Sequence, residues 1–340
     1  MTAPLPAPDR PPPPVALTCG EPAGVGPELA RKAWETLGAS LPFVWLGDPR
    51  HLPRGTPVAR IEDPAEARGA AARGLPVLER RFPERGRPGR TSAANAQAVV
   101  DTIAEGVRLA EAGAVSALCT APIHKAALQE GCGFPHPGHT EFLAALTGAE
   151  HVVMMLACDE LRVVPATIHV PLFEVAMRLT PEHLEATLRA THAALRRDFG
   201  LDRPRIAVAG LNPHAGEGGH IGREEIDVIV PVLDRLRTEG MVLLGPLSAD
   251  TLFHAEARRR YDCAVAMYHD QALIPIKTID FAGGVNVTLG LPIVRTSPDH
   301  GTALDIAGTG AADPTSTIAA LVLAEDIARA RARHPAPAEA

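Results

Sequence analysis

The chain has 340 residues, of which 46% are hydrophobic and 21% charged, and its formal net charge at pH 7 is −7. This length suggests about two domains of roughly 150 residues each, and the acidic balance provides no basic surface for nucleic acid. The five cysteines are scattered without a C-x-x-C pair, so they predict neither a disulfide framework nor a cysteine zinc site. No secretory signal and no apolar window of roughly 18 residues are found, so we expect a cytoplasmic protein without membrane contact.

Residues 1–14 contain so many prolines that they cannot form a regular helix or strand, so we expect a disordered arm there. From Val15 onwards, short apolar runs alternate with amphipathic stretches, which predicts an α/β fold with mostly parallel sheets. The predicted strands are residues 15–19, 43–47, 115–120, 152–157, 205–209 and 263–267. The predicted helices are residues 26–35, 93–112, 224–239, 318–329 and one that begins at Pro181.

Two of these helices carry start signals. Ser92 precedes the helix of residues 93–112 as a candidate N-cap, and Thr180 followed by Pro181 marks the start of another. Residues 68 to 90 are rich in Arg, Gly and Pro, so we interpret this segment as an irregular surface excursion.

Three histidines directly follow strand-like runs: His169, His214 and His269. Ligands in an α/β fold gather beyond the carboxyl ends of strands, and three imidazoles with one open position make a catalytic metal site. The alternative is that each is an ordinary hydrogen-bonded loop or core residue. His214 lies in GLNPHAGEGGHIG, whose glycines permit close backbone approach to a ligand, although a polar surface turn would look similar.

Charged residues in the other polar loops suit proton transfer or an anionic ligand. Asp250 and Asp270 lie in similar loops, where they could orient a metal-bound imidazole, carry a proton or simply be solvated. Lys277 offers a point charge and Arg295 a bidentate fork to an anionic substrate, although most such residues are surface charges.

Six motifs occur in order along the chain: GEPAGVGPE, TAPIHKAAL, HPGHTEFLA, LNPHAGEGG, YHDQALIPIK and GLPIVRTSPDHGTALDIAG. Together they resemble the 4-hydroxythreonine-4-phosphate dehydrogenase family of vitamin B6 biosynthesis, from Val15 to about Ile327. The last motif also resembles the nucleotide-binding loop of isocitrate and isopropylmalate dehydrogenases. Those enzymes bind NAD(P) without the G-x-G-x-x-G fingerprint, of which this chain has only the first half, at Gly24 and Gly26.

The resemblance implies two α/β/α domains with an active-site cleft between them, as in isocitrate and isopropylmalate dehydrogenases. Residues 15–140 and 285–332 would form an outer domain, and residues 141–284 a central domain that makes the interface of a homodimer. Residues 333–340 would be a mobile tail. The active site would be shared across the dimer interface.

The implied reaction is the NAD- or NADP-linked oxidation of 4-phosphooxy-L-threonine to a β-keto acid, which decarboxylates to 3-amino-2-oxopropyl phosphate for pyridoxine 5′-phosphate biosynthesis. One divalent ion per site, zinc, magnesium or cobalt, would be bound by His169, His214 and the neighbouring subunit's His269. The implied substrate contacts are His139, Thr140, Lys277, Asn286 and Arg295. The implied cofactor contacts are Asp299, His300, Gly301, Thr302, Asp305 and Gly308. The candidates for the catalytic proton relay are Lys277, Asp250 and Asp270.

Thr309 departs from the family pattern, because many related loops carry a lysine or arginine near this position, and the change could alter cofactor phosphate contacts or the choice between NAD and NADP. Rival functions also stay open. A paralogue could oxidise 4-phospho-D-threonate, D-erythronate 4-phosphate or a dihydrodiol carboxylate. A protein of another class could bind metal or phosphate without turnover, or hydrolyse phosphate esters, although hydrolysis has no use for the DHGTALDIAG loop.

Overall fold

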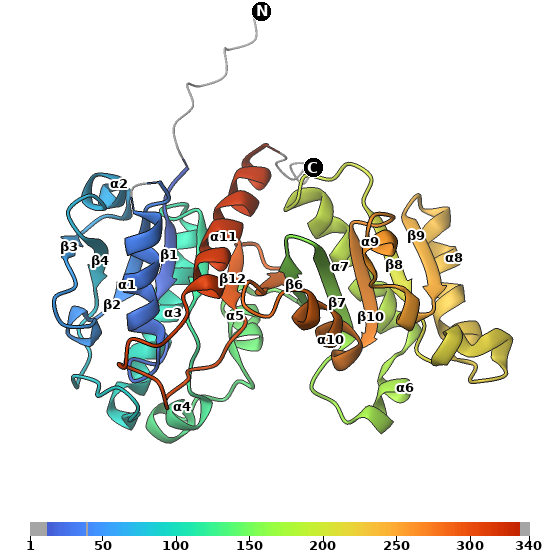
Figure 1. The fold of residues 1–340 in the computed structure, drawn as a ribbon, viewed down its shortest axis with the longest axis horizontal. Helices are drawn as coiled ribbons and strands as arrows, with labels where there is room; N and C mark the ends of the chain where they lie inside the picture. The colour runs from blue at the N-terminus through green and yellow to red at the C-terminus, as the bar shows by residue number, and fades with distance from the viewer. Residues whose placement is uncertain (1–11, 39, 334–340) are drawn as a thin grey trace, which may run out of the picture.

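The computed structural model describes residues 12–38 and 40–333, and its strands form one twelve-stranded sheet (Figure 1). The order across the sheet is β3-β4-β2-β1-β5-β12-β11-β6-β7-β10-β8-β9. The strands are β1 Val15–Thr18, β2 Phe43–Gly47, β3 Val58–Ile61, β4 Leu75–Glu79, β5 Ala117–Thr120, β6 Val153–Cys158, β7 Leu161–Thr167, β8 Arg205–Ala209, β9 Val242–Leu247, β10 Cys263–Tyr268, β11 Val285–Leu289 and β12 Arg295–Pro298.

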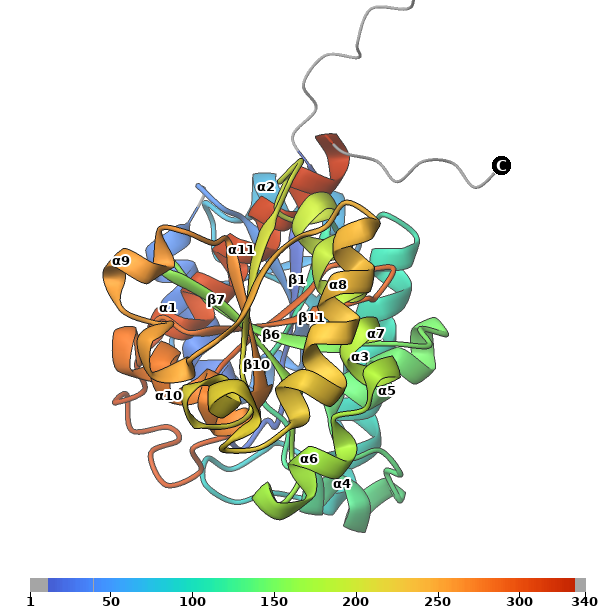
Figure 2. The ribbon, with the colours of Figure 1, turned by 90° about the vertical axis from the view of Figure 1, so that its right-hand side faces the viewer.

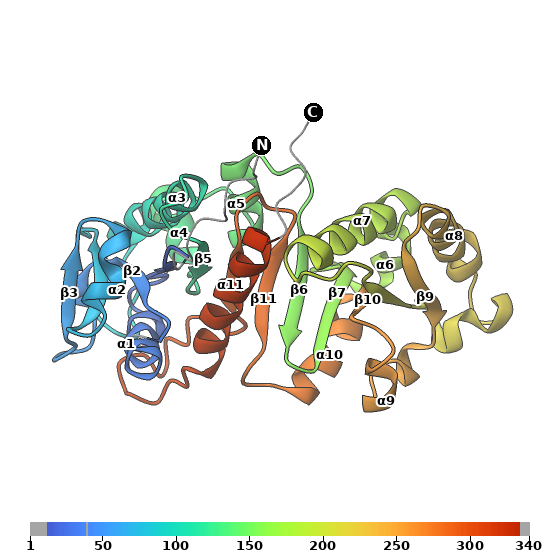
Figure 3. The same ribbon diagram turned by 90° about the horizontal axis from the view of Figure 1, so that it is seen from above.

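Helices cover both faces of the sheet, so the molecule has three layers. Figures 2 and 3 show α1, α9, α10 and α11 on one face and α3, α5, α7 and α8 on the other. The helices are α1 Gly26–Leu37, α2 Ala67–Ala70, α3 Ala96–Glu111, α4 Lys125–Cys132, α5 His139–Thr147, α6 Val175–Arg178, α7 Pro181–Arg197, α8 Val230–Thr238, α9 Ala255–Arg258, α10 His269–Ile279 and α11 Thr315–Arg333.

The apolar runs of the sequence become strands that are buried on both faces. Every residue of β1, β2 and β5 is buried, as expected where helices cover both faces of a parallel sheet. The predicted α/β class with a mostly parallel sheet is confirmed. Among the described helices, none is both long enough and apolar enough to cross a membrane.

The exceptions to parallel pairing lie together in the middle of the sheet. β11 is antiparallel to both β12 and β6, and β6 is antiparallel to β7. All other neighbouring strands in the described sheet pair in parallel. The strands from β3 to β12 therefore run opposite to those from β7 to β9. The division into an outer and a central domain stays a prediction, and one hydrogen-bonded sheet runs through both regions.

Of the two predicted helix caps, only one makes the side-chain hydrogen bond that is expected of a cap. The Thr180 hydroxyl accepts a hydrogen bond from the His183 N–H at 3.2 Å, which confirms this cap at the start of α7. Ser92 has the predicted N-cap position and extended backbone, but its hydroxyl makes no cap hydrogen bond and donates to the Glu84 carboxylate at 2.8 Å. A short 3-10 turn, Ala93–Asn95, lies between Ser92 and α3.

The interpretation of residues 68–90 as irregular surface was wrong in its middle. β4 lies between β3 and β2, and Leu75 and Val77 are fully buried there. The strand is only five residues long, so the polar and glycine-rich residues on both sides obscured it. Most of the predicted arm at residues 1–14 and of the tail at residues 333–340 lies outside the described residues, and α11 continues to Arg333.

Candidate functional site

A cavity of about 580 Å³ lies over the middle of the sheet, beside β5, β12, β11 and β6. Its volume is in the range of small-molecule sites, roughly 300–1,000 Å³. The cavity brings together nine residues that the sequence had singled out in distant parts of the chain: His139, Thr140, His169, His269, Asn286, Arg295, Asp299, His300 and Gly301.

Arg295, at the start of β12, is a buried cation. Its side chain donates to the Thr120 hydroxyl at 2.7 Å and to the Thr288 hydroxyl at 2.8 Å. Among the described residues, no carboxylate forms an ion pair with it, and burial lowers the pKa of Arg295 to about 10. The group is therefore still charged at neutral pH. A buried cation without a counterion is costly, so this position favours an anionic ligand.

Polar atoms without partners line the same cavity as this cation. His139 Nε2, Asn286 Oδ1 and His300 Nε2 are buried and have no hydrogen-bond partner in the described structure. Burial, together with the nearby charges of Arg295 and Lys125, holds the pKa of His139 well below its usual range, so the ring is neutral. Buried polar groups are normally hydrogen-bonded, so these three atoms indicate a ligand that would satisfy them.

The same cavity lies at the amino end of α5, whose first two residues are His139 and Thr140. The first backbone N–H groups of a helix have no partner within the helix, and the helix dipole favours negative charge there. The preceding residue, Gly138, makes no side-chain cap. The helix end therefore adds to the attraction that Arg295 exerts on an anion.

His169 and His269 of this chain face this cavity, whereas the resemblance assigned the neighbouring subunit's His269 to the metal. The ring centroids of His169 and His269 lie 5.9 Å apart, and each residue closely follows the carboxyl end of a strand, β7 and β10. His269 Nδ1 is 2.8 Å from Asp270 Oδ1, which leaves Nε2 free to bind a ligand. His169 has a φ of 51°, an uncommon backbone conformation for a residue with a side chain. The imidazole donor set fits an ion such as zinc.

His214, the third predicted ligand, does not line this cavity. It opens a left-handed turn within the segment Pro213–Gly219, in which φ is positive from His214 through Gly219. The nearby carboxylate is that of Asp250, whose pKa is lowered by a hydrogen bond from Ser248 and by the proximity of His214. Within residues 12–38 and 40–333, no three His, Cys, Asp or Glu side chains lie close enough together to hold a metal ion.

The left-handed turn is held by a buried carboxylate, that of Glu225. One oxygen accepts from the Asn212 N–H at 2.8 Å and the other from Asn212 Nδ2 at 3.0 Å. Glu225 is 3% exposed and begins a π-helical segment, Glu225–Ile229, before α8. Left-handed backbone is costly for residues other than glycine and is found where surrounding structure enforces it, often at functional sites.

Lys277 and Asp299 form an ion pair at the edge of the cavity, with Lys277 Nζ 2.5 Å from Asp299 Oδ2. Asp299 lines the cavity, whereas Lys277 does not. This pair joins α10 to the loop after β12. Two residues that the sequence assigned to different roles, substrate or proton transfer and cofactor binding, therefore contact each other directly.

The loop from Asp299 to Gly310 connects this cavity to a second one. Asp299, His300 and Gly301 line the first cavity, and Gly308 lines the second. The Thr302 carbonyl accepts from the Val25 N–H at 3.0 Å, and Asp305 is exposed; neither Thr302 nor Asp305 lines either cavity. The sequence missed the roles of Thr120 and Thr288, whose hydroxyls hold Arg295.

Comparison with known proteins gives one consistent family. The family model described as "Pyridoxal phosphate biosynthetic protein PdxA" matches residues 40–324. The 4-hydroxythreonine-4-phosphate dehydrogenase of Ruegeria sp. (strain TM1040) is 59% identical over 317 residues, which cover 93% of this chain and 97% of that protein.

Solved structures agree with this result. The crystal structure of 4-hydroxythreonine-4-phosphate dehydrogenase from Klebsiella pneumoniae has a TM-score of 0.85 and 39% identity, and covers 93% of this chain and 99% of its own. A terephthalate 1,2-cis-dihydrodiol dehydrogenase from Burkholderia xenovorans LB400 has a TM-score of 0.64 and 32% identity, with 92% and 97% covered. The chain therefore belongs to the pyridoxal phosphate biosynthetic protein PdxA family.

Proposed function

We propose that this protein is a metal-dependent, NAD(P)-linked dehydrogenase. Its substrate would be 4-phosphooxy-L-threonine, which it would oxidise to a β-keto acid that decarboxylates to 3-amino-2-oxopropyl phosphate, in the cytoplasm. The names of its relatives support the dehydrogenase class and this substrate. The observation that carries the proposal is the buried Arg295, which has no carboxylate partner among the described residues and lies in a cavity with unpartnered polar atoms.

The charged ends of the substrate would be held by groups that are already fixed in place. The guanidinium of Arg295 is oriented by Thr120 and Thr288, so it can meet an anionic oxygen without rearranging. The neutral ring of His139 can donate a hydrogen bond from Nε2, and Thr140 adds its position in the first turn of α5. Asn286 Oδ1 is free to accept from the substrate's ammonium group or hydroxyl.

The oxidation needs the secondary hydroxyl to lose a proton while hydride leaves for the nicotinamide. His169, His214 and the neighbouring subunit's His269 would hold a divalent ion, which would supply the Lewis acidity that lowers the pKa of this hydroxyl. Lys277, Asp250 and Asp270 are the proposed proton relay. Lys277 is paired with Asp299 at the edge of the cavity, and Asp270 orients the ring of His269.

We also propose that the active site is completed by a second copy of the chain. Large apolar side chains are exposed close to the two histidines of the cavity: Leu172, Phe173 and Met177 follow His169, and Ile274 lies in the helix that His269 begins. Phe173 is 78% exposed and Met177 70%. Clustered exposed apolar side chains of this kind are typical of protein interfaces. A homodimer would cover them and bring a partner's imidazole to the site.

The decisive test is turnover followed by the absorbance of reduced nicotinamide, with purified protein, 4-phosphooxy-L-threonine, NAD or NADP, and zinc, magnesium or cobalt. We expect turnover that a chelator abolishes and added metal restores. Arg295→Lys should raise KM at least tenfold, because a point charge replaces the bidentate fork, whereas Arg60→Ala, at an exposed pair with Glu79, should leave KM unchanged. Absence of reduced nicotinamide with every metal would contradict the proposal.

A second candidate is a paralogue that oxidises a different hydroxy acid. The 32% identity to the dihydrodiol dehydrogenase supports this alternative. Kinetics with 4-phosphooxy-L-threonine, 4-phospho-D-threonate, D-erythronate 4-phosphate and a cis-dihydrodiol carboxylate, measured side by side, would separate them by kcat/KM. Growth of a pyridoxine auxotroph that carries this gene would support the first substrate. Ligand binding without turnover on any of the four would favour a non-catalytic binding protein.

A further inference from the structure

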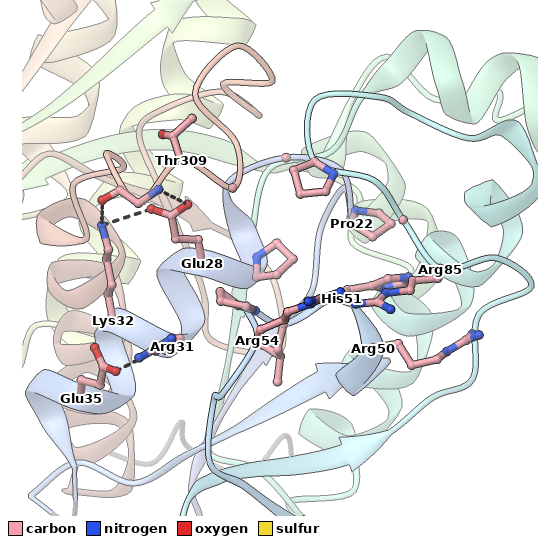
Figure 4. A pocket seen from close by; sticks show the side chains of 18 residues that line it. Pro22, Glu28, Arg31, Lys32, Glu35, Arg50, His51, Arg54, Arg85 and Thr309 are labelled. Carbon is pink, nitrogen blue, oxygen red and sulfur yellow. Dashed lines mark hydrogen bonds and ion pairs between the residues drawn. The ribbon is translucent and has the colours of Figure 1, made fainter.

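A second cavity, of about 650 Å³, lies at the far end of the Asp299–Gly310 loop (Figure 4). Its walls come from the turn before α1, from α1 itself, from residues 50–54 after β2 and from residues 85–88. Gly308, Thr309 and Gly310 complete it. Figure 4 shows Arg54, His51 and Arg85 on one side, and Glu28, Lys32 and Thr309 on the other.

Three of the cations in this cavity already have partners. Lys32 Nζ donates to the Gly310 and Ala312 carbonyls at 2.7 and 2.6 Å and lies 3.1 Å from a Glu28 carboxylate oxygen. Arg31 pairs with Glu35 at 2.7 Å, and Arg50 with Asp48 at 2.6 Å. These charges are neutralised within the protein, so they provide little attraction for a ligand.

Arg54 and Arg85 are different. In the part of the chain that the structure describes, neither forms an ion pair or a side-chain hydrogen bond. Between them lies His51, whose Nε2 is 3.1 Å from the Glu84 carbonyl and whose Nδ1 is buried without a partner. Burial lowers the pKa of His51, with Arg85 adding to the effect, so the ring is neutral at pH 7. Two unpaired guanidinium groups are suited to a phosphate group. Since Nε2 donates to the Glu84 carbonyl, the free Nδ1 of the neutral His51 ring is an acceptor, which can bind a hydroxyl or amino group of a ligand.

Part of the cavity wall is apolar. Pro22, Pro27, Pro53 and Pro88 line it together with Leu52. Proline rings have no N–H donor and present rigid apolar faces, so they can cover a planar ring without leaving a backbone donor unsatisfied. The cavity therefore combines a surface for a planar ring with a separate site for phosphate, which is the chemistry of a phosphorylated nucleoside.

The two cavities are connected by one loop that is fixed against the turn before α1. The Val25 N–H donates to the Thr302 carbonyl at 3.0 Å, and a Cβ added to Gly24 would lie 2.7 Å from the same oxygen. At the far end, a Cβ added to Gly308 would lie 2.6 Å from Pro88. A dinucleotide with its nicotinamide beside the substrate, lying along this loop, would reach the second cavity with its adenosine.

We propose that this second cavity binds the adenosine half of NADP, and that Arg54 and Arg85 hold the 2′-phosphate. This inference rests on the proposed function, which assigns the nicotinamide end to the first cavity. It also explains how the site can lack a cation at Thr309. The Thr309 side chain carries no charge, and its hydroxyl donates a hydrogen bond to the Ile306 carbonyl at 2.6 Å. The cations come from residues 54 and 85 on the opposite wall.

The test is direct binding to the full-length protein by titration calorimetry, with adenosine 2′,5′-bisphosphate and adenosine 5′-monophosphate as probes, because these differ only by the 2′-phosphate. We expect wild-type protein to prefer the bisphosphate by about 100-fold, about tenfold for each arginine. Arg54→Ala and Arg85→Ala should each remove about tenfold of this preference, and the double variant all of it. Arg31→Ala, which changes a paired arginine in the same cavity, is the matched control.

Equal affinity of wild-type protein for the two probes would overturn the inference. So would variants that lose both probes equally, because the arginines would then contact the 5′ side. These outcomes are separable from failure of the proposed function. Turnover with NAD but no preference for the bisphosphate would contradict only the proposed 2′-phosphate site. Arginine-dependent binding of the bisphosphate without turnover would contradict only the proposed dehydrogenase activity and would still support a nucleotide-binding site.

Discussion

The left-handed turn that begins at His214 allows a sharp test by two glycine substitutions. Gly216 is buried, has a φ of +78°, and an added Cβ would lie 2.5 Å from Glu225 Oε2. Gly218 has a φ of +66°, but an added Cβ would meet no atom within 4 Å. Alanine at either position therefore incurs the left-handed backbone cost, and only alanine at position 216 also displaces the Glu225 carboxylate.

The two costs can be estimated separately. A non-glycine residue in left-handed backbone costs about 1–2 kcal/mol. Moving Glu225 weakens its bonds to the Asn212 N–H and Nδ2, and a hydrogen bond to a charged group contributes about 1.5–3 kcal/mol. We therefore expect Gly216→Ala to lower the free energy of unfolding by about 4 kcal/mol and Gly218→Ala by about 1–2 kcal/mol.

Guanidinium unfolding followed by far-ultraviolet circular dichroism measures both values. Repeating the Gly216→Ala measurement in a Glu225→Ala background closes a double-mutant cycle, in which the excess cost at position 216 should largely disappear. Equal losses for the two glycine variants, or an excess that survives without Glu225, would show that the carboxylate does not hold the turn.

Two further predictions concern buried carboxylates. Burial acts to raise the pKa of Asp48, but hydrogen bonds from the Arg50 side chain and from the Phe82 and Arg50 N–H groups outweigh it and hold this pKa at about 2. The lowered pKa stabilises the folded protein by about 2 kcal/mol. This stabilisation is present above pH 4 and is lost as the pH falls towards 2. Asp48→Asn should therefore flatten acid unfolding in this window, and an acid limb as steep as wild type would contradict this. Asp198, 2% exposed and paired with Arg197 and Arg331, joins α7 to α11, so Asp198→Asn should cost about 3–5 kcal/mol in urea unfolding. The control Asp227→Asn, at an exposed pair with Arg223, should cost less than about 1 kcal/mol, and similar losses for the two would refute the role of burial.

Part of the cavity lining could be expected from the sequence, because His169, His269 and Asp299 closely follow strands. The state of the lining residues could not. Arg295 looks like any surface arginine in the sequence, and in the fold it is held by Thr120, which is 175 positions away, and by Thr288 in the neighbouring strand β11. The separation of His214 from the cavity that holds His169 and His269 was equally hidden, since it depends on the path of the left-handed turn.

The fold was predictable where a short run is almost entirely apolar, as in β2 (FVWLG) and β8 (RIAVA), whose predicted ranges match the structure. β4 (LPVLE) was missed because it contains a proline, ends in a glutamate and lies between polar and glycine-rich segments. β11 was also missed, since the polar residues Asn286 and Thr288 interrupt its apolar pattern; Asn286 lines the cavity. Whether the sheet is continuous depends on pairing between β11 and β6, which are more than a hundred residues apart in the chain.

That pairing has a mechanical consequence. β11 and β6 are in register over five residue pairs, from Val285 opposite Ala157 to Leu289 opposite Val153, and these strands lie beside the first cavity. Two bodies joined by a slack linker can swing apart freely, whereas here any opening has to twist a continuous ladder of backbone hydrogen bonds. The floor of the cavity is therefore stiff, and adjustment to substrate and cofactor is left to its rim, above all the Asp299–Gly310 loop and the segment before α5.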